Sequence, residues 1–139
     1  MPPQLPFFVY GTLRPGHRNH QRHLAGRCTE VRGAVLDGAA LHRGPGYPYV
    51  VPCPGQRVRG ELVSVPPALY PRVLADLDRL EDCTPDGLGE YVRERLAVRL
   101  ADGTETDAWV YLASPRVTAA LLSAPAPVAS GDWTDAYRD

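Results

Sequence analysis

The sequence contains no lysine, only one methionine and no long apolar run. All 15 of its basic residues are arginines, and 16 acidic residues bring the formal net charge to -1. A chain without an excess charge of either sign lacks the electrostatic field that draws a protein to nucleic acid. Nucleic acid is therefore disfavoured as its main partner. A length of 139 residues with 44% hydrophobic residues is enough for a single domain with a buried core.

From the sequence, no signal peptide and no membrane-spanning segment are expected. The N-terminus has no basic stretch before an apolar one, and Pro6 interrupts the apolar residues between 5 and 10. The three cysteines, Cys28, Cys53 and Cys83, are odd in number and form no CxxC pair. A disulfide framework is therefore not expected, and a reducing compartment, the cytoplasm, is the predicted location.

Several motifs of catalysis and cofactor binding are absent. There is no GxGxxG and no phosphate-binding loop, and no serine lies in a GxSxG context. His17, His20 and His23 are spaced by three residues, which is compatible with a metal site or with a solvated basic segment containing Arg18 and Arg22. Because no cysteine or carboxylate lies close to them in the sequence, we expect the second case, with no metal and no cofactor.

The order of expected elements predicts an α+β fold. Apolar alternation and turn residues indicate about six strands, one clear helix over 68–81, opened by Pro66 and Pro67, and short helices over 18–25 and 116–123. The expected strands cover 7–10, 31–42, a short piece within 43–55, 57–65, 91–100 and 106–113. Strands do not alternate with helices, so a small, mainly antiparallel barrel with one main helix is favoured over a parallel sheet. Gly33 and Gly38 suggest a bulge or a barrel corner, and residues 101–103 a hairpin turn.

The first candidate site is the turn Tyr10-Gly11-Thr12-Leu13, which follows a buried strand and is closed by Pro15 and Gly16. Successive amide groups in such a turn can point at one spot and form an anion-binding nest. Glycine there would let a ligand approach the backbone closely. An ordinary transition from strand to loop is the alternative.

The second candidate is Glu81, at the end of the expected helix. It lies four residues after Leu77 and therefore on the apolar, core-facing side, with Asp78 on a neighbouring face. Burial there would raise the pKa of its carboxyl group toward the range useful for proton transfer. The alternative is a solvated charge at the helix end. Asp82, beside it, could raise that pKa further.

A third group starts the strand after the acidic segment. Tyr91 and Tyr111 could each place a hydroxyl in the barrel interior, or be core tyrosines with a solvated tip. Arg93 and Arg95 are interpreted as solvent-facing side chains of this strand. Cys83 is discounted as a nucleophile because neighbouring acids would raise its pKa.

Taken in order, these residues resemble the γ-glutamylcyclotransferase-like superfamily, in particular its AIG2-like branch. The resemblance covers residues 5–113 of one domain spanning 1–139, and the tail 114–139 lies outside it. The motifs that carry it are Val9-Tyr10-Gly11-Thr12-Leu13, Gly16-x-x-Asn19, Tyr47-Pro48, Val58-x-Gly60-Glu61-Leu62, Leu77-Asp78-x-x-Glu81, Tyr91-x-Arg93 and Ala108-Trp109-x-Tyr111. Asp82 departs from the pattern, since the family usually has glycine there.

The resemblance implies a barrel with a cavity at one end. It implies that Tyr10–Leu13 bind a γ-glutamyl group, that Glu81 is the catalytic acid and base, and that 5-oxoproline and a free amine are released without metal or cofactor. Asn19, Tyr91 and Tyr111 are expected to bind or orient the small-molecule γ-glutamyl amide. Two alternatives stay open: a binding module without turnover, and removal of a γ-glutamyl protecting group in a biosynthetic pathway. Trp133 and Tyr137 are expected to dock the tail on the barrel or on a neighbouring subunit.

Overall fold

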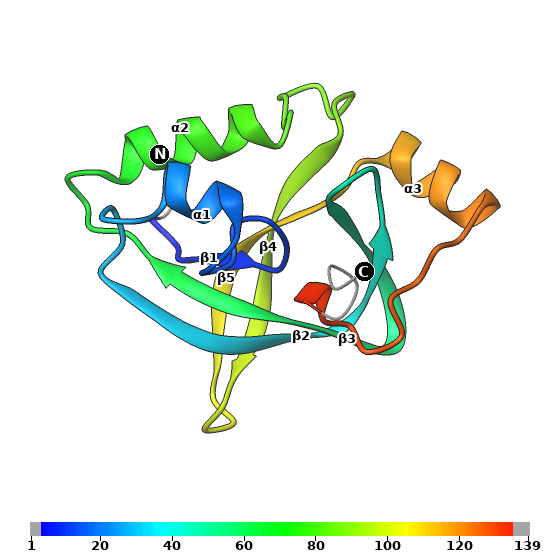
Figure 1. Cartoon of the computed structure of the whole chain (residues 1–139), viewed down its shortest axis with the longest axis horizontal. Helices are drawn as coiled ribbons and strands as arrows, with labels where there is room; N and C mark the ends of the chain where they lie inside the picture. Colours follow the sequence, from blue (N-terminus) through cyan, green and yellow to red (C-terminus); the bar gives the residue numbers. More distant parts are fainter. Residues whose placement is uncertain (1–3, 135–139) are drawn as a thin grey trace.

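Five strands pair in the order β1-β3-β2-β4-β5 and close into a barrel, with helices packed on its outside (Figure 1). The structure is a computed structural model that describes residues 4–134. Its elements, in chain order, are β1 (Phe7–Val9), α1 (Arg18–His23), β2 (Glu30–Arg43), β3 (Pro48–Ser64), α2 (Tyr70–Leu80), β4 (Tyr91–Leu100), β5 (Glu105–Ala113) and α3 (Pro115–Ser123). The prediction of a small, mainly antiparallel barrel with one main helix is confirmed. Among the strands of the described residues, only β1 and β5 pair in parallel, at Phe7 and Trp109.

The expectation of six strands is wrong, because two of the expected strands form the single strand β3. Asp37 of β2 pairs with Arg57, and Ala39 pairs with Pro52, so residues 53–56 bulge out opposite Gly38 alone. Proline cannot donate to a strand ladder and is tolerated at bulges, which explains how this Pro-rich stretch stays within one strand. Gly38 has a φ of 78° and marks the bend expected from the sequence.

Two apolar clusters lie on the two sides of the barrel wall, because successive side chains of a strand point to opposite faces. The first, the barrel core, takes side chains from all five strands, including Phe8, Leu36, Val58, Val98 and Val110. The second, the helix-facing core, packs the outer face of the wall against α2 and α3 and includes the residues Phe7, Val63, Val73, Leu77, Trp109 and Leu121.

Helix α2 begins at Tyr70, two residues later than expected, because Pro66 and Pro67 form a separate turn before it. Val73 and Leu77 are fully buried, as the helical spacing predicts. Leu80 is 36% exposed, since it lies at the end of the helix beside the cavity described below. The hairpin at 101–103 is confirmed by the hydrogen bond from the Leu100 amide to the Thr104 carbonyl, at 2.8 Å.

After α3 the chain turns back and follows the barrel (Figure 1). The Arg43 amide donates to the Ala126 carbonyl, the Val128 amide to the Leu41 carbonyl and the Arg59 amide to the Gly131 carbonyl, each at 2.8 Å. Trp133 is 5% exposed and belongs to the barrel core. Of the two docking residues expected in the tail, Trp133 therefore docks on the barrel itself, and Tyr137 lies outside the described residues. Within residues 4–134, no helix has both the length and the apolar character needed to cross a membrane.

Candidate active site

A cavity of about 340 Å³ lies where the turn after β1 meets the end of α2 and the first residues of β3 and β4. This volume suits a small-molecule ligand. Every residue that the sequence analysis proposed for the site lines it: Tyr10, Gly11, Thr12, Leu13, Asn19, Glu81, Tyr91 and Tyr111. The structure thus brings together residues that lie up to about one hundred positions apart in the sequence, as barrel closure requires.

The turn at one side of the cavity has unused backbone donors. Its own geometry is fixed by the Arg14 amide, which donates to the Gly11 carbonyl at 3.0 Å, and by the Thr12 carbonyl, which accepts from the Asn19 amide at 3.0 Å. Gly11, Thr12 and Leu13 are themselves buried, yet their amides donate no hydrogen bond to any residue described by the structure. Buried donors are rarely left without a partner. These three amides are therefore available to an anionic or carbonyl group in the cavity.

Gly11 is required by close packing against a neighbouring strand. A Cβ atom built at this position would lie 2.6 Å from Cγ and 2.7 Å from Cδ of Pro48, the first residue of β3. Both residues line the cavity, so the contact also sets the width of the cavity at this point. A larger side chain at position 11 would have to displace the turn or Pro48.

Glu81 stands directly after the last turn of α2, and its amide donates to the Leu77 carbonyl at 2.9 Å. The residue as a whole is only partly buried, but its carboxyl group is enclosed by protein, and this burial raises its pKa to about 7. Within residues 4–134, burial is the only cause acting on the pKa of this carboxyl group, without a contribution from a hydrogen-bond donor or a cation. A carboxyl group with this pKa exchanges protons readily near neutral pH.

The expectation that Asp82 would raise the pKa of Glu81 is wrong, because burial alone accounts for the change. Asp82 instead shapes the chain after the helix. Its φ of 49° is left-handed, a conformation that aspartate adopts more easily than most residues and that glycine adopts freely. The Glu90 amide donates to the Asp82 carbonyl at 3.1 Å and to Asp82 Oδ2 at 3.2 Å, which closes the loop 83–90 on itself.

Asp78, one turn before Glu81, ties α2 to two strands. Its Oδ1 accepts from the Tyr111 hydroxyl at 2.6 Å and from Arg93 Nε at 3.0 Å. The guanidinium of Arg93 also lies 4.5 Å from the centre of the Trp109 ring. The interpretation of Arg93 as solvent-facing is therefore wrong, since its side chain is 19% exposed and is held between a carboxylate and an aromatic face. Arg95 does face solvent, paired with Asp107.

Three tyrosine hydroxyls around the cavity are already engaged. Tyr10 donates to the Tyr111 carbonyl at 2.5 Å, Tyr91 to the Pro48 carbonyl at 2.6 Å, and Tyr111 to Asp78. Burial is the main cause that raises the pKa of all three, and the charge of Glu81 adds to it. Tyr91 and Tyr111 belong to the helix-facing core, so of the two alternatives left open by the sequence the structure favours core tyrosines.

Helix α1 contributes polar groups that brace the turn. Asn19 Nδ2 donates to Thr12 Oγ1 at 2.7 Å, and His20 Nδ1 donates to the Leu13 carbonyl at 3.0 Å. No group of three or more His, Cys, Asp or Glu side chains in the described part of the chain is placed to hold a metal ion. Through its hydrogen bond to the Leu13 carbonyl, His20 supports the turn.

Residues not proposed from the sequence complete the cavity wall. Arg18 lies at the cavity with its Nη2 donating to the Gly46 carbonyl at 3.1 Å, and Glu90 accepts from the Tyr49 hydroxyl at 2.7 Å. Tyr47 also lines the cavity. The sequence did not predict that Arg18 and Glu90 line the cavity, because both lie in mainly polar segments without an apolar pattern. Tyr47 belonged to one of the motifs of the family resemblance but had no proposed role.

The family of the chain follows from comparison with known proteins. The family model described as gamma-glutamyl cyclotransferase, AIG2-like, matches residues 7–135. The chain belongs to this family, and its barrel has the γ-glutamylcyclotransferase-like fold.

Individual relatives agree in sequence and fold. A protein of Methanocaldococcus jannaschii with the provisional name gamma-glutamylcyclotransferase is 29% identical over 94% of this chain and 96% of its own length. The crystal structure of an AIG2-like protein from Mus musculus matches with a TM-score of 0.61 and 26% identity, covering 82% of each chain. An uncharacterized protein from Pyrococcus horikoshii shares the fold, with a TM-score of 0.64 at 20% identity over 95% of this chain and 92% of the other.

Proposed function

We propose that this protein is a γ-glutamyl cyclotransferase that converts a γ-glutamyl amide into 5-oxoproline and a free amine. In this reaction the substrate's own α-amine attacks its γ-carbonyl carbon, a five-membered lactam closes, and the bond to the leaving nitrogen breaks. The nucleophile is tethered to the electrophile, so the enzyme has to fold the substrate into a reactive conformer rather than capture a second reactant.

Glu81 is proposed to move the protons. The attacking nitrogen starts as an ammonium group and ends as a lactam N–H, and it therefore loses two protons. The leaving nitrogen starts as an amide N–H and ends as an ammonium group, and it gains two. One carboxyl group that lies between the two nitrogens can accept and return each proton in turn, with no net change. A pKa of about 7 favours both directions of transfer at neutral pH.

The turn is proposed to hold the substrate. The free amides of Gly11, Thr12 and Leu13 would donate to the α-carboxylate of the γ-glutamyl group or to the oxyanion that develops on the γ-carbonyl oxygen. Such preorganised donors contribute most in a site that excludes water, and these three residues are buried.

The single observation that carries the proposal is the arrangement of Glu81. An enclosed carboxyl group lines the same cavity as three backbone amides, and none of these groups has a hydrogen-bond partner among the described residues. A raised pKa near neutrality favours proton transfer over simple pairing with a ligand's ammonium group, for which an ordinary carboxylate is enough. Breakdown of a general γ-glutamyl amide and removal of a γ-glutamyl protecting group use the same lactam-forming reaction. They differ only in the amine that is released.

The proposal is tested by Glu81→Gln, which keeps the shape of the side chain but cannot take up a proton. We expect 5-oxoproline release from a panel of γ-glutamyl amides to fall by at least about a thousandfold, within the range that a general acid and base contributes. Glu94→Gln is the control, because Glu94 is an exposed carboxylate on β4. Near wild-type turnover by Glu81→Gln would remove Glu81 from catalysis, and absence of turnover by the wild-type protein on every amide would leave a binding module.

A further inference from the structure

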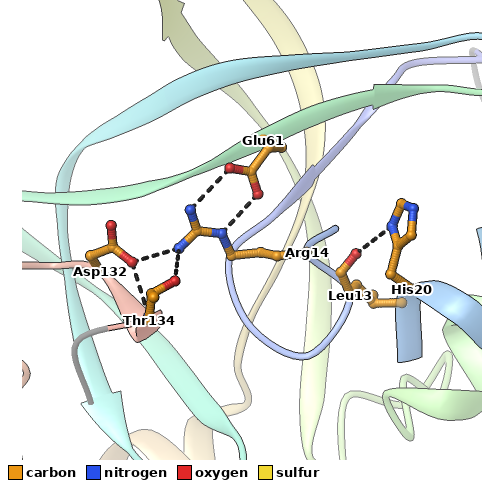
Figure 2. A network of polar contacts seen from close by, with 6 residues as sticks. All are labelled: Leu13, Arg14, His20, Glu61, Asp132 and Thr134. Carbon is orange, nitrogen blue, oxygen red and sulfur yellow. Dashed lines mark hydrogen bonds and ion pairs between the residues drawn. The ribbon is translucent and has the colours of Figure 1, made fainter. Parts of the chain in front are cut away.

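The C-terminal segment reaches the candidate active site through one side chain, Arg14, which directly follows the turn. Figure 2 shows its guanidinium between Glu61 on one side and Asp132 with Thr134 on the other. Arg14 Nε and Nη2 donate to the two oxygens of Glu61 at 2.7 and 2.9 Å, and Nη1 donates to Asp132 Oδ1 at 2.6 Å. The three charged side chains are only 13%, 19% and 23% exposed, so water screens these contacts poorly.

The main chain of Arg14 is part of the turn that presents the free amides. Its amide donates to the Gly11 carbonyl at 3.0 Å, and its carbonyl accepts from the His17 amide at 3.0 Å. Arg14 thus connects the charged contacts of its guanidinium to the backbone of residues 11–13. On the opposite side of the turn, His20 holds the Leu13 carbonyl (Figure 2).

The segment that supplies Asp132 packs closely against β3. Gly131 has a φ of 70°, and a Cβ atom there would lie 2.1 Å from the Arg57 carbonyl oxygen, so the segment runs directly against β3. Thr134 and Ser130 orient Asp132: the Thr134 amide donates to its Oδ1 at 2.9 Å, and its own amide donates to Ser130 Oγ at 3.2 Å.

From these contacts we infer that Asp132 is a positioning residue: it fixes the ligand-binding turn through Arg14, and it makes the tail beyond 113 a functional part of the site. This inference rests on the proposed role of the turn amides. Asp132 does not line the cavity and lies 118 positions from Arg14 in the sequence. Its effect is therefore on the geometry of the donors rather than on proton transfer.

Asp132→Ala and Asp132→Asn test the inference. Glu61 still pairs with Arg14 in both variants, which preserves the fold. We expect KM for the γ-glutamyl amide to rise roughly five- to tenfold with alanine, the change produced by losing about 1 to 1.4 kcal/mol of binding free energy. With asparagine the rise should be smaller, because the amide oxygen can still accept from Arg14. The pH dependence of kcat should stay unchanged in both, since Glu81 is untouched.

Asp37→Ala is the matched control. Asp37 accepts from Arg99 Nε and Nη2 at 2.9 and 3.2 Å, in a more exposed aspartate–arginine pair that, within the described part of the chain, makes no hydrogen bond to the turn or to residues 126–134. An unchanged KM in Asp132→Ala, or an equal rise in the control, would overturn the inference.

A second readout does not depend on turnover. In ¹H–¹⁵N spectra, the amide signals of Gly11, Thr12 and Leu13 should shift in Asp132→Ala and stay in place in Asp37→Ala. If the wild-type protein releases no 5-oxoproline while these signals shift, the cyclotransferase proposal fails and the positioning role stands. If the signals stay in place in Asp132→Ala, the positioning role fails whatever the activity.

Discussion

At the scale of single residues, Glu81 combines two properties that oppose one another. Its enclosure raises the pKa of the carboxyl group to about 7, which suits proton transfer, and the same enclosure makes the ionised form costly in the folded protein. No cation or hydrogen-bond donor in the described chain offsets that cost. A buried, unpaired carboxyl group lowers the free energy of unfolding, and the same burial gives the group a pKa suited to proton transfer.

The residue-scale prediction is that Glu81→Gln stabilises the protein at alkaline pH. The folded-state pKa lies above the unfolded value, so the folded protein binds the extra proton between about pH 4 and 7, and the free energy of unfolding falls as pH rises through this window. Removing the charge should therefore raise stability by up to roughly 3 kcal/mol at pH 8 and by almost nothing below about pH 4. Urea unfolding at pH 8, 6 and 4 measures this.

Glu94→Gln provides the baseline for that series, because its carboxylate is exposed. A Glu81→Gln variant whose stability relative to wild type does not change with pH would show that the carboxyl group titrates normally. Its proposed role in proton transfer would then lose its physical basis.

At the scale of secondary-structure elements, Asp78 is the contact that holds the end of α2 against the barrel wall. It accepts from Tyr111 on β5 and from Arg93 on β4, and Glu81 follows one turn later. The position of the Glu81 carboxyl group therefore depends on the contacts of Asp78 with Tyr111 and Arg93. Asp78 itself does not line the cavity.

We predict that Asp78→Ala lowers the free energy of unfolding by about 2 kcal/mol, the magnitude for charged hydrogen bonds that lose their acceptor. It should also reduce kcat, because the end of α2 is released. Asp107→Ala removes another aspartate paired with an arginine of β4, in a pair whose side chains are 54% and 44% exposed, and should cost less than about 1 kcal/mol. Denaturant unfolding and steady-state kinetics of the two variants provide the test, and equal losses in both would contradict it.

At the scale of the whole molecule, the barrel core is completed by the tail. Val128 and Trp133 join side chains from all five strands in that core, and the segment from Ala126 to Gly131 is hydrogen-bonded to β2 and β3. The tail thus links the stability of the barrel to the geometry of the candidate active site, through Trp133 on one side and Asp132 on the other.

We predict that Trp133→Ala destabilises the protein by about 3–5 kcal/mol, as expected for a large aromatic side chain removed from a core. Its indole is 5% exposed. Leu122→Ala, on α3, is the control, because that side chain is 67% exposed and should cost little. Thermal or urea unfolding measures both, and a loss below about 1 kcal/mol at position 133 would mean that the tail is not part of the core.

The sequence by itself determined where most elements lie and which of their faces are buried. Alternation of apolar residues located the barrel strands, and the four-residue step from Leu77 placed Glu81 on the core-facing side of α2. These features are local, because the period of a helix or strand fixes the direction of each side chain relative to its neighbours.

Only the tertiary structure decided which partners meet. It merged two expected strands into β3, engaged the tyrosine hydroxyls, drew Arg93 onto Asp78 and Trp109, and brought Asp132 to Arg14. The spacing of apolar residues along a helix or strand predicts that a side chain is buried, but it does not predict which residues that side chain contacts. Contacts between distant segments are set by the register and closure of the barrel, which depend on the packing of the whole chain.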